Sequence, residues 1–349
     1  MSDPSLANLN PQRVLIIKPS AIGDIVHALP VLSLVRRKWP AARISWLVTP
    51  VCSGLLDGHP LLDEVILFDR KRWGGMWRSP RLAGEWRRFT REIRARQFDL
   101  VLDLQGLFRS GWLAWKTGAP VRVGFANARE LAPLFYTHRV PIDTPEQHAI
   151  DRYLKLARFI GCDAGPVEFP FATTEADRQH VAKLLRPEVG ECRFAVLLPG
   201  TNWETKRWPV GKFAGLVAPL RERFGLMSVL AGGPDAGAMA PQIPGAVDLT
   251  CKTTLKQLTA LLERADLVVA NDSGPMHIAS ALGRPLVTPF GPTNPVRTGP
   301  YGRMDSVIKI DIVCSPCYAR TCSHRSCLRW LDVGPVVRLA EEQMGKARA

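Results

Sequence analysis

Short apolar runs rich in β-branched residues alternate with helix-like segments along the chain. The run at 13–18 is typical of a buried strand, and 24–39 then carries apolar residues at helical spacing. This alternation predicts a parallel sheet with helices on both faces. Further strands are expected at 44–48, 65–68, 100–102 and 121–124, with helices between them, including the basic segment 86–97.

The pattern breaks at 164–176, where Ala-Gly-Pro and Phe-Pro-Phe occur, and a second alternation follows. A length of 349 residues fits two domains. We therefore expect an α/β fold of two Rossmann-like, doubly wound domains, 1–170 and 171–349, facing a ligand cleft at the carboxyl ends of their strands. We leave open whether the last helix packs back on the N-terminal domain. The second domain should contain strands at 194–198, 227–231, 267–270 and 286–290, and helices at 210–224, 255–265, 276–282 and 333–344.

The formal net charge of +14 predicts a polyanionic partner: nucleic acid, an anionic membrane surface or a phosphorylated substrate. No apolar run approaches the roughly 18–20 residues that span a bilayer. Segment 1–12 is polar and has no signal-peptide pattern, so we expect a cytoplasmic protein. In that compartment the eight cysteines are expected to be thiols.

The first candidate site residue is Asp24, which follows Gly23 at the turn after the first strand. A carboxylate there can act as a catalytic base at the mouth of a cleft, or it can cap the following helix. The spacing favours neither. The turn lacks Gly-x-Gly-x-x-Gly, so it is no dinucleotide fingerprint.

The second candidate is the loop 198–209, which follows the first strand of domain two. Gly200 and Thr201 can bring backbone and hydroxyl donors close to a phosphate, and Lys206 can supply a compact positive charge. The alternative is a solvated loop with Trp208 packed inward.

The third candidate, 270–277, opens a helix after a buried strand. Backbone N–H groups at Ser273 and Gly274 would bind phosphate, with His277 one turn into the helix. In the alternative interpretation, Asp272 or Ser273 is a simple helix cap and His277 is a core residue. Together with the Lys206 loop, the segment favours a diphosphate site. Asp235, which follows Gly232-Gly233-Pro234, is a candidate ribose contact, although a plain turn explains this segment equally well. Segment 292–295 can line the same site.

The fourth feature is basic. Between residues 70 and 96 there are ten arginines or lysines and two acids, with tryptophans at 73, 77 and 86. A solvated helix face explains many such runs, but this excess favours an anionic acceptor or membrane surface. No recognition module for nucleic acid accompanies it. Candidate acceptor contacts are Arg70, Lys71, Arg72, Arg109, Arg129 and Arg152.

The cysteines near the C-terminus form Cys314-x-x-Cys317-x4-Cys322-x4-Cys327. The first pair begins like a zinc site, but the second Cys-x-x-Cys is missing. Free or redox-sensitive thiols are therefore favoured over a bound metal.

These motifs together resemble the heptosyltransferases of lipopolysaccharide inner-core synthesis, in glycosyltransferase family 9. The resemblance extends from Arg13 to about Val336 and rests on 18–30, 103–107, 201–209 and 271–277. The N-terminal half is more similar to heptosyltransferase I, through 58–60, 129–130, 134–136 and 147–152. The C-terminal half, with 206–209 and the cysteines, is also similar to heptosyltransferase II.

The resemblance implies a GT-B fold and an inverting transfer from ADP-L-glycero-D-manno-heptose to the Kdo of Kdo-lipid A, without an obligatory metal or other cofactor. It implies a protein held peripherally at the inner face of the inner membrane, with no nucleic-acid partner. Asp24 matches the family's proposed general base and Lys206 its diphosphate-binding lysine. The family's phosphate-binding helix start matches Asp272, Ser273, Gly274 and His277.

One position departs from the family pattern. Some relatives have a glutamate after the Gly-Pro turn, where this chain has Asp235-Ala236, which leaves the ribose contact open. Two alternatives are a nucleotide-sugar epimerase, which would need no basic acceptor surface, and a nucleic-acid-binding protein, which would leave the Lys206 and Asp272 motifs unexplained.

Overall fold

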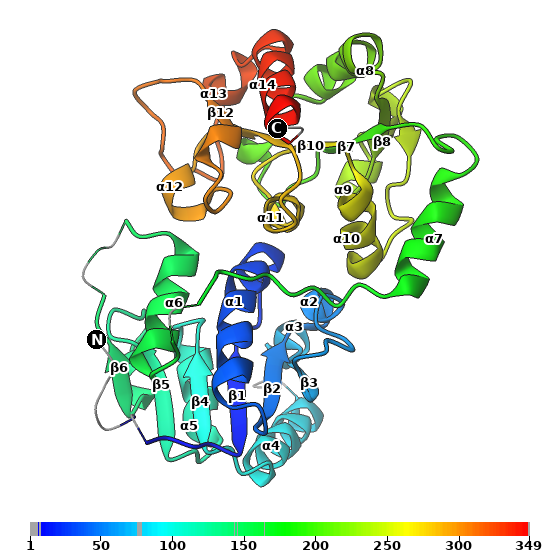
Figure 1. Ribbon diagram of the computed structural model, residues 1–349. Coiled ribbons are helices and arrows are strands. Elements are labelled where there is room, and N and C mark those ends of the chain that lie inside the picture. Colours follow the sequence, from blue (N-terminus) through cyan, green and yellow to red (C-terminus); the bar gives the residue numbers. More distant parts are fainter. Residues whose placement is uncertain are drawn as a thin grey trace. The chain divides into compact units, whose positions relative to one another are not determined.

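The computed structural model describes residues 6, 8–74, 79–142, 144, 146–163 and 165–347; Trp77 of the basic segment lies outside them. The chain divides into two compact units, Met1–Ala172 and Thr173–Ala349, two residues beyond the expected boundary. In the described part, each unit contains a six-stranded parallel sheet with helices on both faces, which confirms the expected doubly wound architecture (Figure 1).

The sheet of the first unit has the order β3-β2-β1-β4-β5-β6. Its central strands are apolar runs buried on both faces, as parallel strands must be. Helices α1 (Ile22–Lys38) and α6 (Ala149–Phe159) pack together on one face, and α4 (Pro80–Ala95) and α5 (Phe108–Lys116) on the other. The strands are β1 (Arg13–Ile17), β2 (Arg43–Val48), β3 (Glu64–Leu67), β4 (Leu100–Asp103), β5 (Val121–Phe125) and β6 (His138–Val140).

Helix α4 explains how a very basic segment joins a packed domain. The helix is strongly amphipathic: Phe89 and Ile93 are buried against the sheet. Trp86 stacks on Trp112 of α5 at a ring separation of 5.4 Å, while most arginines of α4 face solvent. The helix begins at Pro80, six residues before the expected start, because Ser79 caps it by accepting the Leu82 N–H at 3.4 Å.

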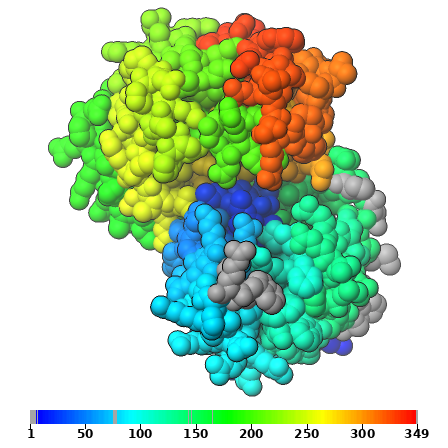
Figure 2. Space-filling view, turned by 180° about the vertical axis from the view of Figure 1, so that it is seen from behind, coloured from blue at the N-terminus to red at the C-terminus, as the bar shows by residue number. Residues whose placement is uncertain are grey.

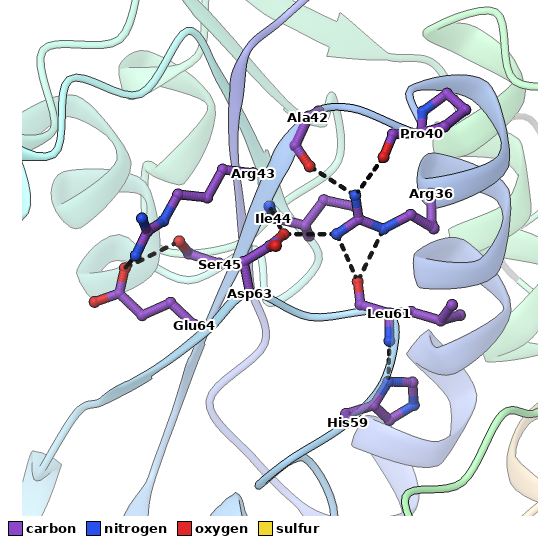
Figure 3. A network of polar contacts seen from close by, with 10 residues as sticks. All are labelled: Arg36, Pro40, Ala42, Arg43, Ile44, Ser45, His59, Leu61, Asp63 and Glu64. Atoms are coloured by element: carbon purple, nitrogen blue, oxygen red, sulfur yellow. Dashed lines mark hydrogen bonds and ion pairs between the residues drawn. The ribbon is translucent and has the colours of Figure 1, made fainter.

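A polar network fixes the connection from α1 to β2 and β3 (Figure 3). The Arg36 guanidinium donates to the carbonyls of Pro40, Ala42 and Leu61, and to Asp63 Oδ2 at 2.6 Å. Asp63 Oδ2 also accepts the Ile44 N–H at 2.8 Å. These bonds satisfy carbonyls that the loops would otherwise leave unpaired, and they link the starts of β2 and β3 to α1.

The second unit has the strand order β12-β11-β10-β7-β8-β9. Its core joins the central strands to α8 (Val210–Phe224) and α14 (Val333–Lys346), with Trp208 and Phe213 fully buried. Helix α14 packs on α8 and β11 of its own unit. Helices α7 (Glu175–Leu185), α10 (Leu255–Arg264) and α11 (Gly274–Ala281) form another group. The strands are β7 (Phe194–Leu198), β8 (Met227–Leu230), β9 (Val247–Asp248), β10 (Leu267–Ala270), β11 (Leu286–Phe290) and β12 (Val307–Lys309).

Three strands, β6, β9 and β12, are absent from the sequence-based expectation. Each lies at an edge of its sheet and is two or three residues long. Edge strands are half-solvated and carry polar residues, so they lack the apolar run that marks a central strand. Among the described residues no helix is long and apolar enough to cross a membrane.

Candidate active site

The donor-side candidates of the second unit meet where β7, β10 and β11 end. Lys206 lies in a short 3₁₀ turn, η4 (Glu204–Lys206), and its Nζ is 2.7 Å from Asp272 Oδ2. The two side chains are only 16% and 5% exposed. Thr293, after β11, donates its hydroxyl to the same carboxylate oxygen at 2.6 Å. The carboxylate therefore holds the ammonium in place, and both groups are largely shielded from water.

Asn271 ties the two loops of this site together. Its Oδ1 accepts the Trp208 N–H at 3.0 Å, and its Nδ2 donates to the Pro199 carbonyl at 2.7 Å. The residue is fully buried, so both amide ends are satisfied inside the protein. Sequence reasoning assigned Asn271 no role. Trp208 is packed inward, as predicted by the alternative in which the loop has no ligand. Its indole N–H donates to the Leu331 carbonyl at 2.9 Å.

Thr201 has a different environment from the expected one. Its hydroxyl donates to the Asp272 carbonyl at 3.1 Å, and its own carbonyl accepts two bonds from Arg207. The side chain is buried. In this structure Thr201 therefore holds the loop in position, and its hydroxyl proton is already used.

The start of α11 meets the requirements of an anion site. Ser273 is the N-cap residue in extended conformation, but its side chain makes no capping bond. Among the described residues its Oγ is buried without a hydrogen-bond partner. His277 lies one turn into the helix and is nearly buried. The first N–H groups of this helix and the Ser273 hydroxyl are donors that an anionic group can satisfy.

Asp235 reaches the same loop from α9 (Pro234–Gly237). A Cβ placed on Gly200 would lie 2.7 Å from Asp235 Oδ2, so the carboxylate sits directly over the Gly200 backbone. Gly200 must therefore lack a side chain. The structure thus brings Asp235 to the Lys206 loop.

The cysteine-rich segment packs on the Lys206 loop. Thr205 donates to the Ala319 carbonyl at 2.8 Å, and Arg325 pairs with Glu204 at 3.0 Å. Lys206 and Arg320 both lie 4.7 Å from the Trp203 ring centroid. All eight cysteines are free thiols, and no group of three potential ligands among the described residues is arranged to hold a metal. Burial raises the pKa of the Cys327 thiol, and the nearby Cys314, Cys317 and Cys322 raise it further.

In the first unit, Asp24 lies in the first turn of α1 and uses its two carboxylate oxygens differently. Oδ2 accepts the Ala21 N–H at 2.9 Å, which caps the helix. Oδ1 lies 3.4 Å from Lys18 Nζ and accepts the Tyr153 hydroxyl at 3.5 Å. The capping and catalytic interpretations of Asp24 are thus compatible, because each uses a different oxygen of a partly exposed side chain.

Lys18 and Tyr153 are site residues that sequence reasoning did not assign. Burial acts to lower the pKa of Lys18, but the Asp24 carboxylate and Tyr153 outweigh it and raise that pKa. The lysine is therefore a permanent cation beneath Asp24. Burial raises the pKa of Tyr153, which stays a hydroxyl donor at neutral pH. Lys18 is the first residue of the motif 18–30, so the sequence contained a signal for it. Nothing in the sequence links Tyr153 to Asp24, which lies 129 positions away.

The six proposed acceptor cations follow β3, β4, β5 and β6, on the edge of the sheet that also presents Asp24 after β1. Arg70, Lys71 and Arg72 form the exposed helix α3 (Arg70–Trp73). Arg72 differs from its neighbours because it pairs with both carboxylate oxygens of Glu85 at 2.8 Å. Its charge is therefore partly offset within the protein.

The remaining three cations lie on the β4–β6 side of that edge. Arg109 and Arg129 are exposed, and the Arg129 N–H donates to the Gly106 carbonyl at 3.0 Å. Arg152 packs over the Phe125 ring at 4.3 Å and donates to Asn127 at 2.9 Å.

The motif 103–107 shapes the turn after β4. Asp103 is fully buried, and its Oδ1 accepts the N–H groups of Gln105 and Gly106, at 2.9 and 3.1 Å. Tyr136 donates its hydroxyl to Oδ2 at 2.7 Å. Burial raises the pKa of Asp103, against the lowering effect of these hydrogen bonds. Asp103 is thus a turn-forming residue.

A groove of about 850 Å³ in the first unit lies away from this site. It is lined by Arg91, Arg94 and Asp99, near the amino end of β4, and includes none of the expected site residues. The opposite, carboxyl edge of the sheet carries the candidate chemistry, so we place the site there.

The fold is that of a glycosyltransferase of the GT-B class. A family model, "Glycosyltransferase family 9 (heptosyltransferase)", matches residues 86–327, and the chain belongs to this family. The chain is similar to lipopolysaccharide heptosyltransferase 1 of Pseudomonas aeruginosa, with 33% identity over 90% of this chain and 88% of that protein.

Two solved structures of E. coli heptosyltransferase WaaC are also similar, each at 28% identity. The one with ADP has a TM-score of 0.76 and covers 95% of this chain and 99% of that one. The one with ADP-2-deoxy-2-fluoro heptose has a TM-score of 0.74 and covers 97% and 100%.

Proposed function

We propose that this protein transfers L-glycero-D-manno-heptose from ADP-heptose to the Kdo sugar of Kdo-lipid A in lipopolysaccharide inner-core synthesis. The observation that carries the proposal is the diphosphate-type site of the second unit, where Lys206 is held by Asp272 beside the start of α11. The heptosyltransferase relatives, and the ADP-heptose analogue bound to one of them, support this donor.

On the donor side, negative charge develops on the departing diphosphate. One proton of the Lys206 ammonium points at Asp272, which leaves two donors for phosphate oxygens. The Ser273 hydroxyl and the first N–H groups of α11 supply further donors, with His277 beside them. Preorganised donors in a shielded site stabilise such charge strongly. We propose Asp235 as the ribose contact, and a positioning role for Thr201.

On the acceptor side, Asp24 takes the proton of the attacking hydroxyl through Oδ1, the oxygen that does not cap α1. Lys18 and Tyr153 hold that oxygen in place. The acceptor attacks opposite the leaving ADP, through an oxocarbenium-like transition state. The acidic acceptor is bound by cations of the first unit: Arg70, Lys71, Arg109, Arg129 and Arg152. Arg72 also takes part, with a charge that Glu85 partly offsets.

We also propose that the protein works in the cytoplasm, peripherally at the inner face of the inner membrane. The acceptor is a lipid, and a net charge of +14 favours an anionic surface.

A transfer assay with radiolabelled ADP-heptose tests the proposal directly. We expect label to pass to Kdo-lipid A, and EDTA to leave the rate nearly unchanged. Transfer only to an acceptor that already carries a first heptose would assign the chain to heptosyltransferase II instead. Salt-dependent binding to random DNA, together with no ADP binding, would favour a nucleic-acid-binding protein and refute the proposal.

A further inference from the structure

Four large apolar side chains are exposed together on one part of the first unit. They come from α5 and the 3₁₀ helix η3 (Ala132–Phe135) with its preceding residue. Phe108 and Trp115 are 47% and 48% exposed, and Leu131 and Leu134 are each 68% exposed. We call Phe108, Trp115, Leu131 and Leu134 the α5–η3 patch. Segment 108–140 is the teal part of the first unit in Figure 2.

The two elements that carry the patch, α5 and η3, pack against each other. Phe135 bridges them, with ring centroids 5.3 Å from Phe108 and 6.4 Å from Trp115. Gly111 permits this approach, because a Cβ there would lie 3.0 Å from both the Ala132 carbonyl oxygen and the Phe135 ring.

The backbone is strained at Leu131, one of the exposed residues of the patch. Glu130 and Leu131 both adopt left-handed conformations, with φ of 56° and 60°. A bulky residue there costs conformational energy, and such strain concentrates at functional sites. Leu131 nevertheless stays mostly exposed to solvent.

Cations surround the patch. Lys116 Nζ lies 4.4 Å from the Trp115 ring centroid, and Arg139 donates to the Pro133 carbonyl at 3.0 Å, beside Leu134. Arg109 directly follows Phe108, Arg129 lies two residues before Leu131, and both arginines are exposed. Segment 108–140 contains five arginines or lysines and a single acid, Glu130, whose carboxylate accepts the Phe108 N–H at 3.3 Å.

We propose that the α5–η3 patch docks onto an anionic phospholipid bilayer. Aromatic and leucine side chains favour the boundary between headgroups and acyl chains, and cations beside them favour anionic headgroups. A second copy of this chain fits less well, because a twofold contact would place the same cations against one another. The inference deepens the proposed membrane location and rests on that part of the proposed function. Phe108 follows the carboxyl end of β4, so docking places the acceptor edge of this unit's sheet near the lipid.

Vesicle sedimentation tests the proposal. The full-length protein is mixed with vesicles of phosphatidylethanolamine and phosphatidylglycerol, or of phosphatidylcholine alone. The patch variant carries Trp115→Ser and Leu134→Ser. The matched control carries Trp330→Ser and Val313→Ser, which are exposed residues of the second unit. We expect the patch variant to bind anionic vesicles about tenfold more weakly or worse, and the control to bind like the wild type.

A second variant, Lys116→Gln, tests the charge component. It should weaken binding to anionic vesicles by roughly fivefold, and the loss should shrink in high salt. Thermal melting establishes that each variant is folded. Transfer to a deacylated, water-soluble Kdo acceptor should be unchanged in the patch variant, which separates this inference from the proposed reaction.

Three results would overturn the inference. The wild type could fail to bind anionic vesicles, or the patch variant could bind as well as the control. A change in the oligomeric state of the patch variant without lipid would identify the surface as a contact between protein chains.

Discussion

At Asp24 a single carboxylate carries both a structural and a proposed chemical role. Oδ2 accepts the Ala21 N–H, whereas Oδ1 faces Lys18 and Tyr153. Asparagine can keep the capping bond, because its side-chain oxygen is also an acceptor, but it cannot take a proton. The two roles can therefore be separated by choosing the substitution.

We expect Asp24→Asn to lower kcat by roughly 10²–10⁴-fold, the usual contribution of a general base. ADP affinity and melting temperature should stay near the wild-type values. Asp24→Ala should lose the same activity and, in addition, about 1 kcal/mol of stability from the missing cap. Steady-state kinetics, ADP titration and thermal melting measure these effects. Near-normal turnover in a destabilised Asp24→Ala protein would leave only the capping role.

Lys206 and Asp272 form a pair whose loss can be tested in two stages. Lys206→Met leaves the 5% exposed Asp272 carboxylate without its cation, and we expect it to cost about 2 kcal/mol. It should also weaken ADP binding and lower kcat together. In Lys206→Met/Asp272→Asn the buried charge is gone, so stability should recover while ADP binding does not. Calorimetric ADP titration and urea unfolding measure both properties. Recovery of ADP affinity in the double variant would show that Lys206 only neutralises Asp272.

At the scale of the elements, the network in Figure 3 joins the end of α1 to β2 and β3. Burial acts to raise the pKa of Asp63, but the Ile44 N–H and the Arg36 guanidinium outweigh it and lower that pKa. A carboxyl with a lowered pKa stabilises the fold above its unfolded pKa of about 3.9. This stability disappears as the pH falls through the folded-state pKa, below that value.

Asp63→Asn should therefore lower stability at pH 7 by less than about 1 kcal/mol, because the carboxylate is partly exposed and its interactions are screened. The difference from the wild type should vanish at a pH below both pKa values. Urea unfolding of both proteins over the acidic range checks this. Arg43→Ala should have a smaller effect of the same kind, since Arg43 also lowers the pKa of Asp63 but pairs only loosely with neighbouring Glu64, at 3.9 Å. An equal destabilisation by Asp63→Asn at every pH would contradict the ionic explanation.

At the scale of the whole molecule, the phosphate-type motifs belong to one unit, whereas Asp24 and the proposed acceptor cations belong to the other. Each unit should therefore control the KM of one substrate. Because Arg72 already pairs with Glu85, Arg70 and Lys71 are the better probes of the α3 surface.

We expect Arg70→Ala/Lys71→Ala to raise the KM for Kdo-lipid A several-fold and to leave the KM for ADP-heptose unchanged. Exposed charges are screened over about 10 Å at 0.1 M salt, so the effect should shrink as ionic strength rises. Arg87→Ala/Arg88→Ala on α4 removes the same charge from another exposed surface and serves as the control. Kinetics at two salt concentrations decide the matter. Equal effects of the two pairs would indicate a general charge effect, with the acceptor held by Arg109, Arg129 and Arg152.

The sequence alone determined the central strands and the position of the loops that follow them. Buried parallel strands are apolar on both faces, and a glycine or proline lies in the turns after β1, β7, β10 and β11, so these signals are local. For this reason β7, β10 and β11 were predicted residue for residue, and the Lys206 and Asp272 motifs were recognised as parts of one site.

Only the tertiary structure decided which side chains touch. The contacts of Tyr153 with Asp24, of Asn271 with the Lys206 loop, and of Arg72 with Glu85 depend on strand order and helix packing. The edge strands β6, β9 and β12 and the α5–η3 patch were missed for the same reason. A half-exposed strand or an exposed leucine has the same local sequence as many others, and its role is set by neighbours distant in the chain.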